Sequence, residues 1–135
     1  MTIQPYLFFN GRCEEAIDFY RGAIDAKVTH IMRFKDVPNA CSPEQQNENK
    51  IMHAAVQIGG TTVLASDGEC RGNPSFGGFG LSLNAPNETE AERQFGALAD
   101  GGAVITPLTK TFFASKFGMV KDRFGVTWMV VAGSA

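Results

Sequence analysis

Apolar residues at the start of the chain follow first a strand-like and then a helix-like spacing. Residues 3–9 form an apolar run that predicts a strand, and Asn10-Gly11 ends it. From residue 13 to 24 the apolar side chains recur every three or four positions, which predicts an amphipathic helix with one buried face. That stripe consists of Cys13, Ala16, Ile17, Tyr20, Ala23 and Ile24. Residues 28–34 return to alternation and predict a second strand.

Two further apolar runs, residues 51–58 and 61–66, flank Gly59-Gly60. A Gly-Gly pair between two strands favours a tight hairpin, because both turn positions tolerate positive φ. The segment before the hairpin, residues 35–49, is polar and carries two prolines, so we expect a long loop there. A second, glycine-rich loop is expected at residues 67–78.

The second half of the chain repeats this order of elements. A strand is expected at residues 79–84, followed by a helix with Asn87 as its N-cap and Glu90 as the reciprocal partner. The apolar stripe of this helix consists of Ala91, Phe95, Leu98 and Ala99. Gly101-Gly102 is typical of a helix end. Further strands are expected at residues 103–107, 111–120 and 126–131, with a turn at 122–125 between the last two.

The predicted order is therefore β-α-β-β-β, twice, and such an internal repeat decides the fold. We expect an α+β fold in which two tandem βαβββ modules, residues 1–70 and 71–135, make up a single domain over residues 1–135. Side by side, the modules would form a curved eight-stranded mixed sheet with outer helices and a cupped inner face. Cups of that kind commonly hold small ligands.

Composition and charge limit the classes of partner. The length of 135 residues suits one domain, and the formal net charge of -2 argues against nucleic-acid binding. No apolar run approaches the roughly 20 residues that cross a bilayer, and the N-terminus lacks signal-peptide features, so we expect no membrane partner and a cytoplasmic location. The cysteines form no CxxC pair, which indicates free thiols rather than disulfides or a thiolate zinc site. They are Cys13, Cys41 and Cys70.

Five segments, taken together, carry a resemblance to a known superfamily. They are residues 11–20, 53–54, 65–67, 111–118 and 122–128. Over nearly its whole length the chain resembles the vicinal oxygen chelate superfamily, which includes glyoxalase I, extradiol dioxygenases and the bleomycin and fosfomycin resistance proteins. Within it, the chain is most similar to the PhnB-like subfamily, labelled 3-demethylubiquinone-9 3-methyltransferase. The resemblance implies the paired βαβββ arrangement of the glyoxalase/bleomycin resistance fold, and a homodimer.

The resemblance also bears on metal binding. In the metal-dependent members, two strands of each module supply ligands to a divalent cation that acts as a Lewis acid. The corresponding positions here are Pro5, the chain between Leu64 and Ser66, Gly78 and Met129. Pro, Gly and Met offer no hard oxygen or imidazole donor, so the comparison implies no metal and no metal cofactor at that place. Methyl transfer lacks support too, because no glycine-rich strand-to-helix turn for a nucleotide-like cofactor is present.

We therefore expect a PhnB-like protein that binds an unknown small molecule in a metal-free cup. The candidate ligand-binding residues are His53, Asp67, Phe113, Phe117 and Met129. For His53 and Asp67 two interpretations stay open: a His–carboxylate pair in the cup, or side chains that cap strand ends and satisfy backbone groups. The hairpin register places these two on opposite faces of the sheet unless a bulge intervenes.

Other aromatic and histidine positions also have alternatives. Phe112, Phe113 and Phe117 form either a wall for a flat ligand or part of an apolar core. Alternation along the last strand points Trp128 toward the helices and Met129 into the cup. His30 lies on the apolar face of its strand, where a buried or edge-packed side chain is expected rather than a ligand-binding one.

The alternative function is an enzyme of the lyase, isomerase or dioxygenase type with a displaced metal site. In that case His53 and Asp67, with Glu69 or Cys70, would supply the metal ligands. The sequence leaves open whether the chain catalyses a reaction.

Overall fold

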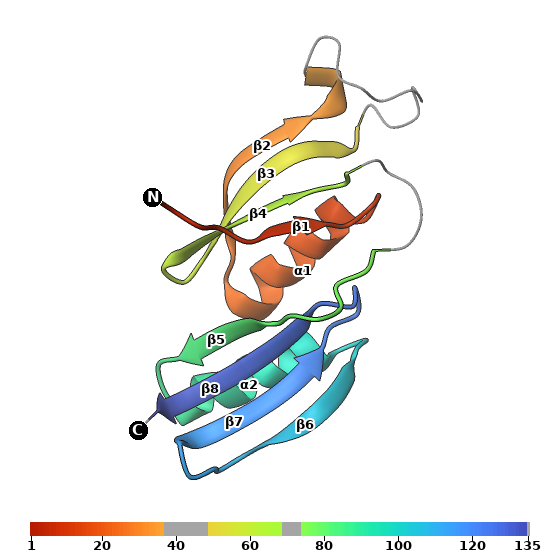
Figure 1. The fold of residues 1–135 in the computed structure, drawn as a ribbon. Helices are drawn as coiled ribbons and strands as arrows, with labels where there is room; N and C mark the ends of the chain where they lie inside the picture. Colours follow the sequence, from red (N-terminus) through yellow and green to blue (C-terminus); the bar gives the residue numbers. More distant parts are fainter. Residues whose placement is uncertain (37–48, 69–73, 135) are drawn as a thin grey trace. The chain divides into compact units, whose positions relative to one another are not determined.

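The computed structural model describes residues 1–36, 49–68 and 74–134. The chain divides into two compact units, Met1–Pro74 and Ser75–Ala135. Within the described residues, each unit has one α-helix and one four-stranded sheet (Figure 1). The expectations for Cys41, Glu69 and Cys70 lie outside the described residues.

The first unit is a mixed sheet with a helix on one face. Its strand order is β1-β4-β3-β2, in which β1 runs parallel to β4 and the other pairs are antiparallel. The elements are β1 (Tyr6–Phe8), α1 (Cys13–Ile24), β2 (Lys27–Arg33), the 3₁₀ helix η1 (Phe34–Asp36), β3 (Ile51–Ile58) and β4 (Thr61–Ser66). The first strand is shorter than the predicted 3–9, because residues 1–4 are exposed and only the Pro5 carbonyl and the Phe9 amide extend its ladder.

The second unit repeats the first. Its strand order is β5-β8-β7-β6, again with the first strand parallel to the last and the other pairs antiparallel. The elements are β5 (Leu81–Ala85), α2 (Glu88–Ala99), β6 (Ala103–Thr109), β7 (Ala114–Lys121) and β8 (Thr127–Ser134). Both helices have 12 residues, and their first residues, 13 and 88, lie 75 apart. The predicted α+β fold class of two βαβββ modules with mixed sheets is confirmed.

The turns show how local sequence sets the strand pairing. Ile58 pairs with Thr61 across Gly59-Gly60, as predicted. The expectation of two left-handed turn residues is wrong, since Gly59 has φ 59° and Gly60 is not in the positive-φ region. One left-handed glycine at the first central position fits a type II′ turn, which also matches the twist of a hairpin.

Both helices bury the faces that the sequence predicts. All six stripe residues of α1 are buried, and they pack against one face of the first sheet, where Leu7, Ala54 and Val56 are also buried. In the second unit Trp128 is 2% exposed, which confirms that it belongs to the core on the α2 side of β8. Asn87 caps α2 by accepting the Glu90 amide at 2.8 Å, and Gly101 (φ 78°) follows the helix end.

One packing expectation is wrong. His30 is exposed, although its position among apolar residues predicted burial. The reason is that β2 forms the edge of the first sheet and that His30 points to the face that α1 does not cover. Among the described residues, no helix is long and apolar enough to span a membrane.

Candidate functional site

The first sheet has a face that α1 does not cover, called here the free face of the first sheet. Alternation along β1 sends Leu7 toward α1 and the neighbouring Tyr6 and Phe8 to the free face. Along β3 the buried Ala54 faces α1, so His53 lies on the free face. The strand arrangement thus gathers ring side chains on one side of the sheet.

Four of these side chains form a continuous row, called here the ring row: Phe8, Tyr6, His53 and His30. The Tyr6 and Phe8 rings stack with centroids 4.8 Å apart at an interplanar angle of 26°. Tyr6 and His53 have ring centroids 5.6 Å apart, and His53 and His30 have theirs 6.1 Å apart. The row crosses the sheet from β1 at one edge to β2 at the other.

A hydrogen bond fixes the centre of this row. The Tyr6 hydroxyl lies 3.0 Å from His53 Nδ1, so the phenol donates to a neutral nitrogen or the protonated nitrogen donates to the phenol oxygen. Either arrangement orients the imidazole and leaves its Nε2 for another partner. The half-buried pair can therefore bind a polar group of a ligand, while Phe8 offers an apolar surface.

Tyr6 was not among the residues that sequence reasoning selected. Tyr6 and His53 are 47 residues apart, and β4 lies between their strands. Only the parallel register of β1 on β4, with Tyr6 beside Leu64, places the phenol within reach of the imidazole. The sequence offered only a weak signal. Tyr6 lies in a mostly apolar first strand, and counting along the strands puts it on the same face of the sheet as His53 in the third strand.

Asp67 lies on the other side of the sheet, in contact with α1. It is 1% exposed, and its Oδ1 accepts the amides of Gly11 at 2.8 Å and Cys13 at 2.7 Å. Its Oδ2 accepts the Ile51 amide at 2.8 Å. Arg12, at the N-cap of α1, makes no side-chain capping bond, so Asp67 supplies the acceptor that this helix start requires. This geometry agrees with the second interpretation, in which the carboxylate satisfies backbone groups.

His53 and Asp67 are not brought together, and no contact in the described residues joins them. The β3–β4 register, with Ala54 beside Ala65, puts the two on opposite faces, as hairpin counting predicts. A register shift does occur between β2 and β3, where Met32 pairs with His53 and Arg33 with Ile51. That bulge leaves His53 on the free face.

Two electrostatic features surround the start of α1. Burial, together with the nearby Asp67 carboxylate, raises the pKa of the Cys13 thiol far above its usual value, which makes the thiol a poor nucleophile. The Arg33 guanidinium hydrogen bonds to Glu14 and lowers the pKa of that carboxyl from its ordinary 4.5. Arg33 also donates to the Asn49 carbonyl at 2.6 Å, and so ties β2 to the residue two positions before β3.

The second sheet carries the remaining candidates on the face that α2 does not cover. Met129 pairs with Met119, and Phe117 pairs with Val131, so these side chains share one face, opposite that of the buried Trp128. The Phe113 and Phe117 rings meet edge to face at 5.1 Å, and Phe112 meets Phe113 at 5.2 Å. Phe112 is 98% exposed, so this cluster is not a buried core.

Asp122 acts in the second unit much as Asp67 acts in the first. It is 3% exposed and accepts the amides of Phe124 and Val126 through Oδ1 and the Trp128 indole N–H through Oδ2, at 2.9 to 3.0 Å. These bonds hold the turn between β7 and β8 and orient Trp128. The sequence predicted this turn but not the role of its acid.

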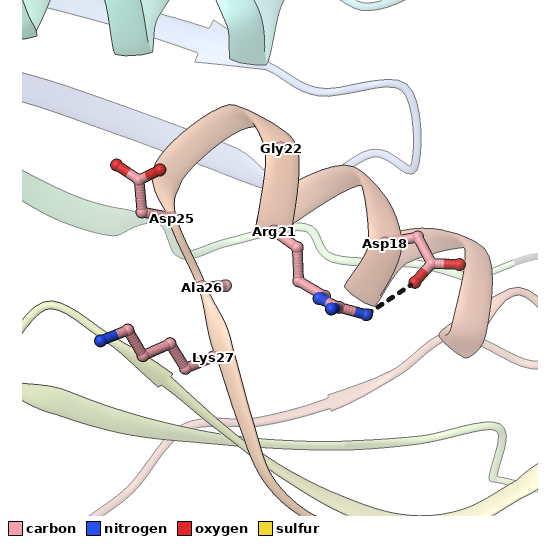
Figure 2. Close-up of a pocket in the computed structure, with 6 residues that line it drawn as sticks. All are labelled: Asp18, Arg21, Gly22, Asp25, Ala26 and Lys27. Atoms are coloured by element: carbon pink, nitrogen blue, oxygen red, sulfur yellow. Dashed lines mark ion pairs between the residues drawn. The ribbon is translucent and has the colours of Figure 1, made fainter.

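A surface depression of the first unit lies away from the ring row. Figure 2 shows it at the C-terminal end of α1, where Arg21 points toward Asp18 and the two form an ion pair at 3.6 Å. Its lining residues are Asp18, Arg21, Gly22, Asp25, Ala26 and Lys27. Two acidic and two basic side chains line the depression, so it has no net charge that would favour an ion.

The resemblance assigns the superfamily's metal ligands to four positions, and their side chains show which donors are present there. Pro5 and Gly78 carry no metal-binding side-chain atom, the stretch 64–66 is Leu-Ala-Ser with one hydroxyl, and Met129 carries only a soft thioether. Among residues 1–36, 49–68 and 74–134, no three His, Cys, Asp or Glu side chains gather as a metal-binding group would. The residues at those four positions do not fit a hard divalent cation.

Comparison with known proteins places the chain in a family. The family model described as 3-demethylubiquinone-9 3-methyltransferase matches residues 1–131. The chain belongs to this family. Protein YjdN of Escherichia coli K12 is 33% identical, over 96% of this chain and 94% of YjdN.

Solved structures connect this family to the PhnB-like proteins and to the vicinal oxygen chelate fold. Protein PA1353 from Pseudomonas aeruginosa is 40% identical, with a TM-score of 0.87 over 100% of this chain and 99% of that one. The PhnB protein from Bacillus cereus is 27% identical, with a TM-score of 0.81 over 98% of this chain and 100% of that one. The fosfomycin resistance protein FosX from Mesorhizobium loti, at 9% identity and a TM-score of 0.67 over 99% of this chain and 92% of FosX, shares the fold alone.

Proposed function

We propose that this PhnB-like protein binds a small, flat organic molecule on the free face of its first sheet, without the superfamily's metal. The observation that carries the proposal is the ring row, in which an oriented imidazole lies between stacked aromatic rings and an exposed histidine. The ligand would place an aromatic or unsaturated portion against Phe8 and Tyr6. A hydrogen-bonding group, such as a carboxylate, would meet the imidazole of His53.

The candidates on the second sheet form a separate apolar surface in the second unit. Phe117 and Met129 lie on one face of that sheet, and Phe113 packs on Phe117 at 5.1 Å. Partly exposed aromatic and thioether groups of this kind can provide adaptable, apolar contacts. We assign Asp67 a structural role instead, because both of its oxygens accept backbone N–H groups.

The positions of His53 and Asp67 weigh against the alternative function, an enzyme with a displaced metal site. A site on His53 and Asp67 would need both side chains to reach one ion, but they lie on opposite faces of the sheet. Asp67 would also have to give up its hydrogen bonds to α1 and β3. Removing the acceptor from two buried amides and one part-buried amide would cost on the order of several kcal/mol.

A thermal-shift experiment tests the proposal. The full chain, with EDTA present, is heated with small aromatic carboxylates, benzoate first, and with benzyl alcohol as the uncharged counterpart. Binding to the folded state increases the free energy of unfolding by RT ln(1 + [ligand]/Kd), about 2.7 kcal/mol at 100 Kd, and so raises Tm. We expect benzoate-class acids to raise Tm more than benzyl alcohol does.

Variants locate the binding. His53→Ala and Tyr6→Phe are expected to reduce the Tm rise strongly. Lys27→Ala, in the depression at the end of α1, is the matched control and is expected to keep the full rise. The proposal is overturned if no aromatic acid shifts Tm, or if His53→Ala and Tyr6→Phe shift as the wild type does.

A further inference from the structure

The chain has two histidines, and the fold brings them together. His30 and His53 are 23 positions apart in sequence and lie on the neighbouring strands β2 and β3. In the register His30 pairs with Ala55 and Met32 pairs with His53, so the two histidines are diagonal neighbours on the free face. Diagonal neighbours on one sheet face are within reach of each other's long or ring side chains.

The ring separation suits a shared metal ion. A bond of about 2.0–2.1 Å from imidazole nitrogen to metal places each ring centroid about 3.2 Å from the ion, so two rings on one ion have centroids about 4.5–5.2 Å apart at angles of about 90–110°. The observed separation of 6.1 Å is about 1 Å longer, and the ring planes meet at 52°. Small side-chain rotations at the exposed His30 would close the remainder.

The hydrogen bond from Tyr6 matches what metal-binding histidines require. Such a histidine usually engages its other ring nitrogen with a protein group, which fixes the orientation of the ring. Here Tyr6 Oη lies 3.0 Å from His53 Nδ1, and Nε2 is the nitrogen left to bind a metal. His53 is half-buried and His30 exposed, so an ion could reach both from solvent.

We propose that His30 and His53 form a two-imidazole site for a late first-row divalent metal ion, with Cu²⁺ bound more tightly than Zn²⁺. Imidazole suits both ions, and the order follows the general stability series of these metals. Water or a ligand group would complete the coordination. The site is separate from the superfamily's metal positions, and it rests on the histidine pair rather than on the small-molecule proposal.

Metal titration of the full chain without any organic ligand tests this inference. Protein freed of metal by EDTA and then of EDTA by dialysis is titrated with Cu²⁺, and separately with Zn²⁺, in competition with a chromophoric chelator. We expect one ion per chain and tighter binding of Cu²⁺. His30→Ala and His53→Ala should each weaken binding at least about 10-fold, because each removes one of two ligands.

Zn²⁺ also allows a direct spectroscopic readout. Because the chain has only two histidines, their ring C–H signals are easily assigned by NMR in the two variants. One equivalent of Zn²⁺ should shift both sets of signals in the wild type. Gln57→Ala, which removes an exposed side chain from the same face of β3, is the control and should bind as the wild type does.

The following results would overturn the proposed histidine site. Equal affinity in the wild type and in His30→Ala overturns the site, as does binding of several ions per chain with no shift of the histidine signals, which would indicate adventitious ions only. His30→Ala decides the matter even if His53→Ala fails to fold, since His30 is exposed and at a sheet edge. The aromatic-acid experiment contains EDTA, so its failure would leave the metal result unaffected.

Discussion

At the scale of single residues, two buried aspartates accept several N–H groups each, Asp67 from distant segments and Asp122 from its own turn. Asp67 joins the end of β4 to the first residues of α1 and β3, and Asp122 holds the β7–β8 turn and the Trp128 indole. A buried carboxylate is stable in such a place because several N–H donors replace its lost hydration. We therefore assign both residues a role in stabilising the fold rather than in binding a ligand.

Asp67→Asn tests this role. The amide cannot accept from all three backbone N–H groups as the carboxylate does, so at least one buried donor loses its partner. We expect the free energy of unfolding to fall by roughly 2–4 kcal/mol. Urea unfolding followed by circular dichroism measures it. Asp18→Asn, in an exposed ion pair, should change stability by no more than about 0.5 kcal/mol, and equal effects in the two variants would contradict the assignment.

The same residue shows where sequence reasoning reached its limit. Asp67 was a candidate as part of the segment 65–67, which carries the family resemblance, but its partners Gly11 and Cys13 are more than 50 residues away. No local pattern reports which helix start an acid will reach. The contact between Tyr6 and His53 was missed for a similar reason, since it depends on the register of a parallel strand pair.

At the scale of elements, local sequence patterns were sufficient to predict both helices and the order of the strands. The stripe that begins at Cys13 predicted α1 and its buried face, and Asn87 predicted the start of α2. Strand ends were less predictable, because they depend on pairing with neighbours: β7 begins at Ala114 rather than residue 111, where the Thr111 amide instead bonds the Ala114 carbonyl. The edge position of β2 likewise exposed His30.

Close approach of backbone to backbone should make one glycine irreplaceable. A Cβ at Gly102 would lie 2.1 Å from the Lys121 carbonyl oxygen, and relief would require movement of the β7 end. We expect Gly102→Ala to destabilise by about 3 kcal/mol or more. A Cβ at Gly96, inside α2, meets nothing within 4 Å, so Gly96→Ala should stabilise by about 0.5–1 kcal/mol. Thermal unfolding of both variants distinguishes them, and similar Tm values would contradict the packing.

The ion pair between α1 and β2 should give a small pH dependence. Arg33 lowers the pKa of Glu14, so the pair stabilises the fold above the ordinary carboxyl pKa of 4.5, and this contribution is lost as pH falls through the lower folded-state value. Because the Glu14 side chain is 57% exposed, we expect less than about 1 kcal/mol. Urea unfolding of wild type and Glu14→Gln should differ at pH 7 and converge in acid. A difference that grows in acid would contradict this sign.

At the scale of the whole molecule, the fold is two copies of one module with different surfaces. The first sheet presents the ring row, and the second presents Phe113, Phe117 and Met129. The duplication of the module could be predicted, because both halves of the sequence show an amphipathic helix pattern and a turn between two strands. The chemistry of each face could not, since it depends on which side chains the sheet registers bring together.

The resemblance to the superfamily also leads us to propose a homodimer. Sedimentation equilibrium of the full chain should then give twice the mass of one chain at micromolar concentration. A single-chain mass over that range would contradict the proposal. This result is independent of the ligand and metal experiments.

The most direct test of the central claim is NMR mapping of a bound aromatic acid. ¹H–¹⁵N spectra of the full chain are recorded with increasing benzoate and with EDTA present. Binding on the free face of the first sheet predicts saturable shifts concentrated at the amides around Tyr6 and His53, and their loss in His53→Ala. The largest shifts at Asp18, Arg21 and Lys27, or no saturable shift at all, would contradict it.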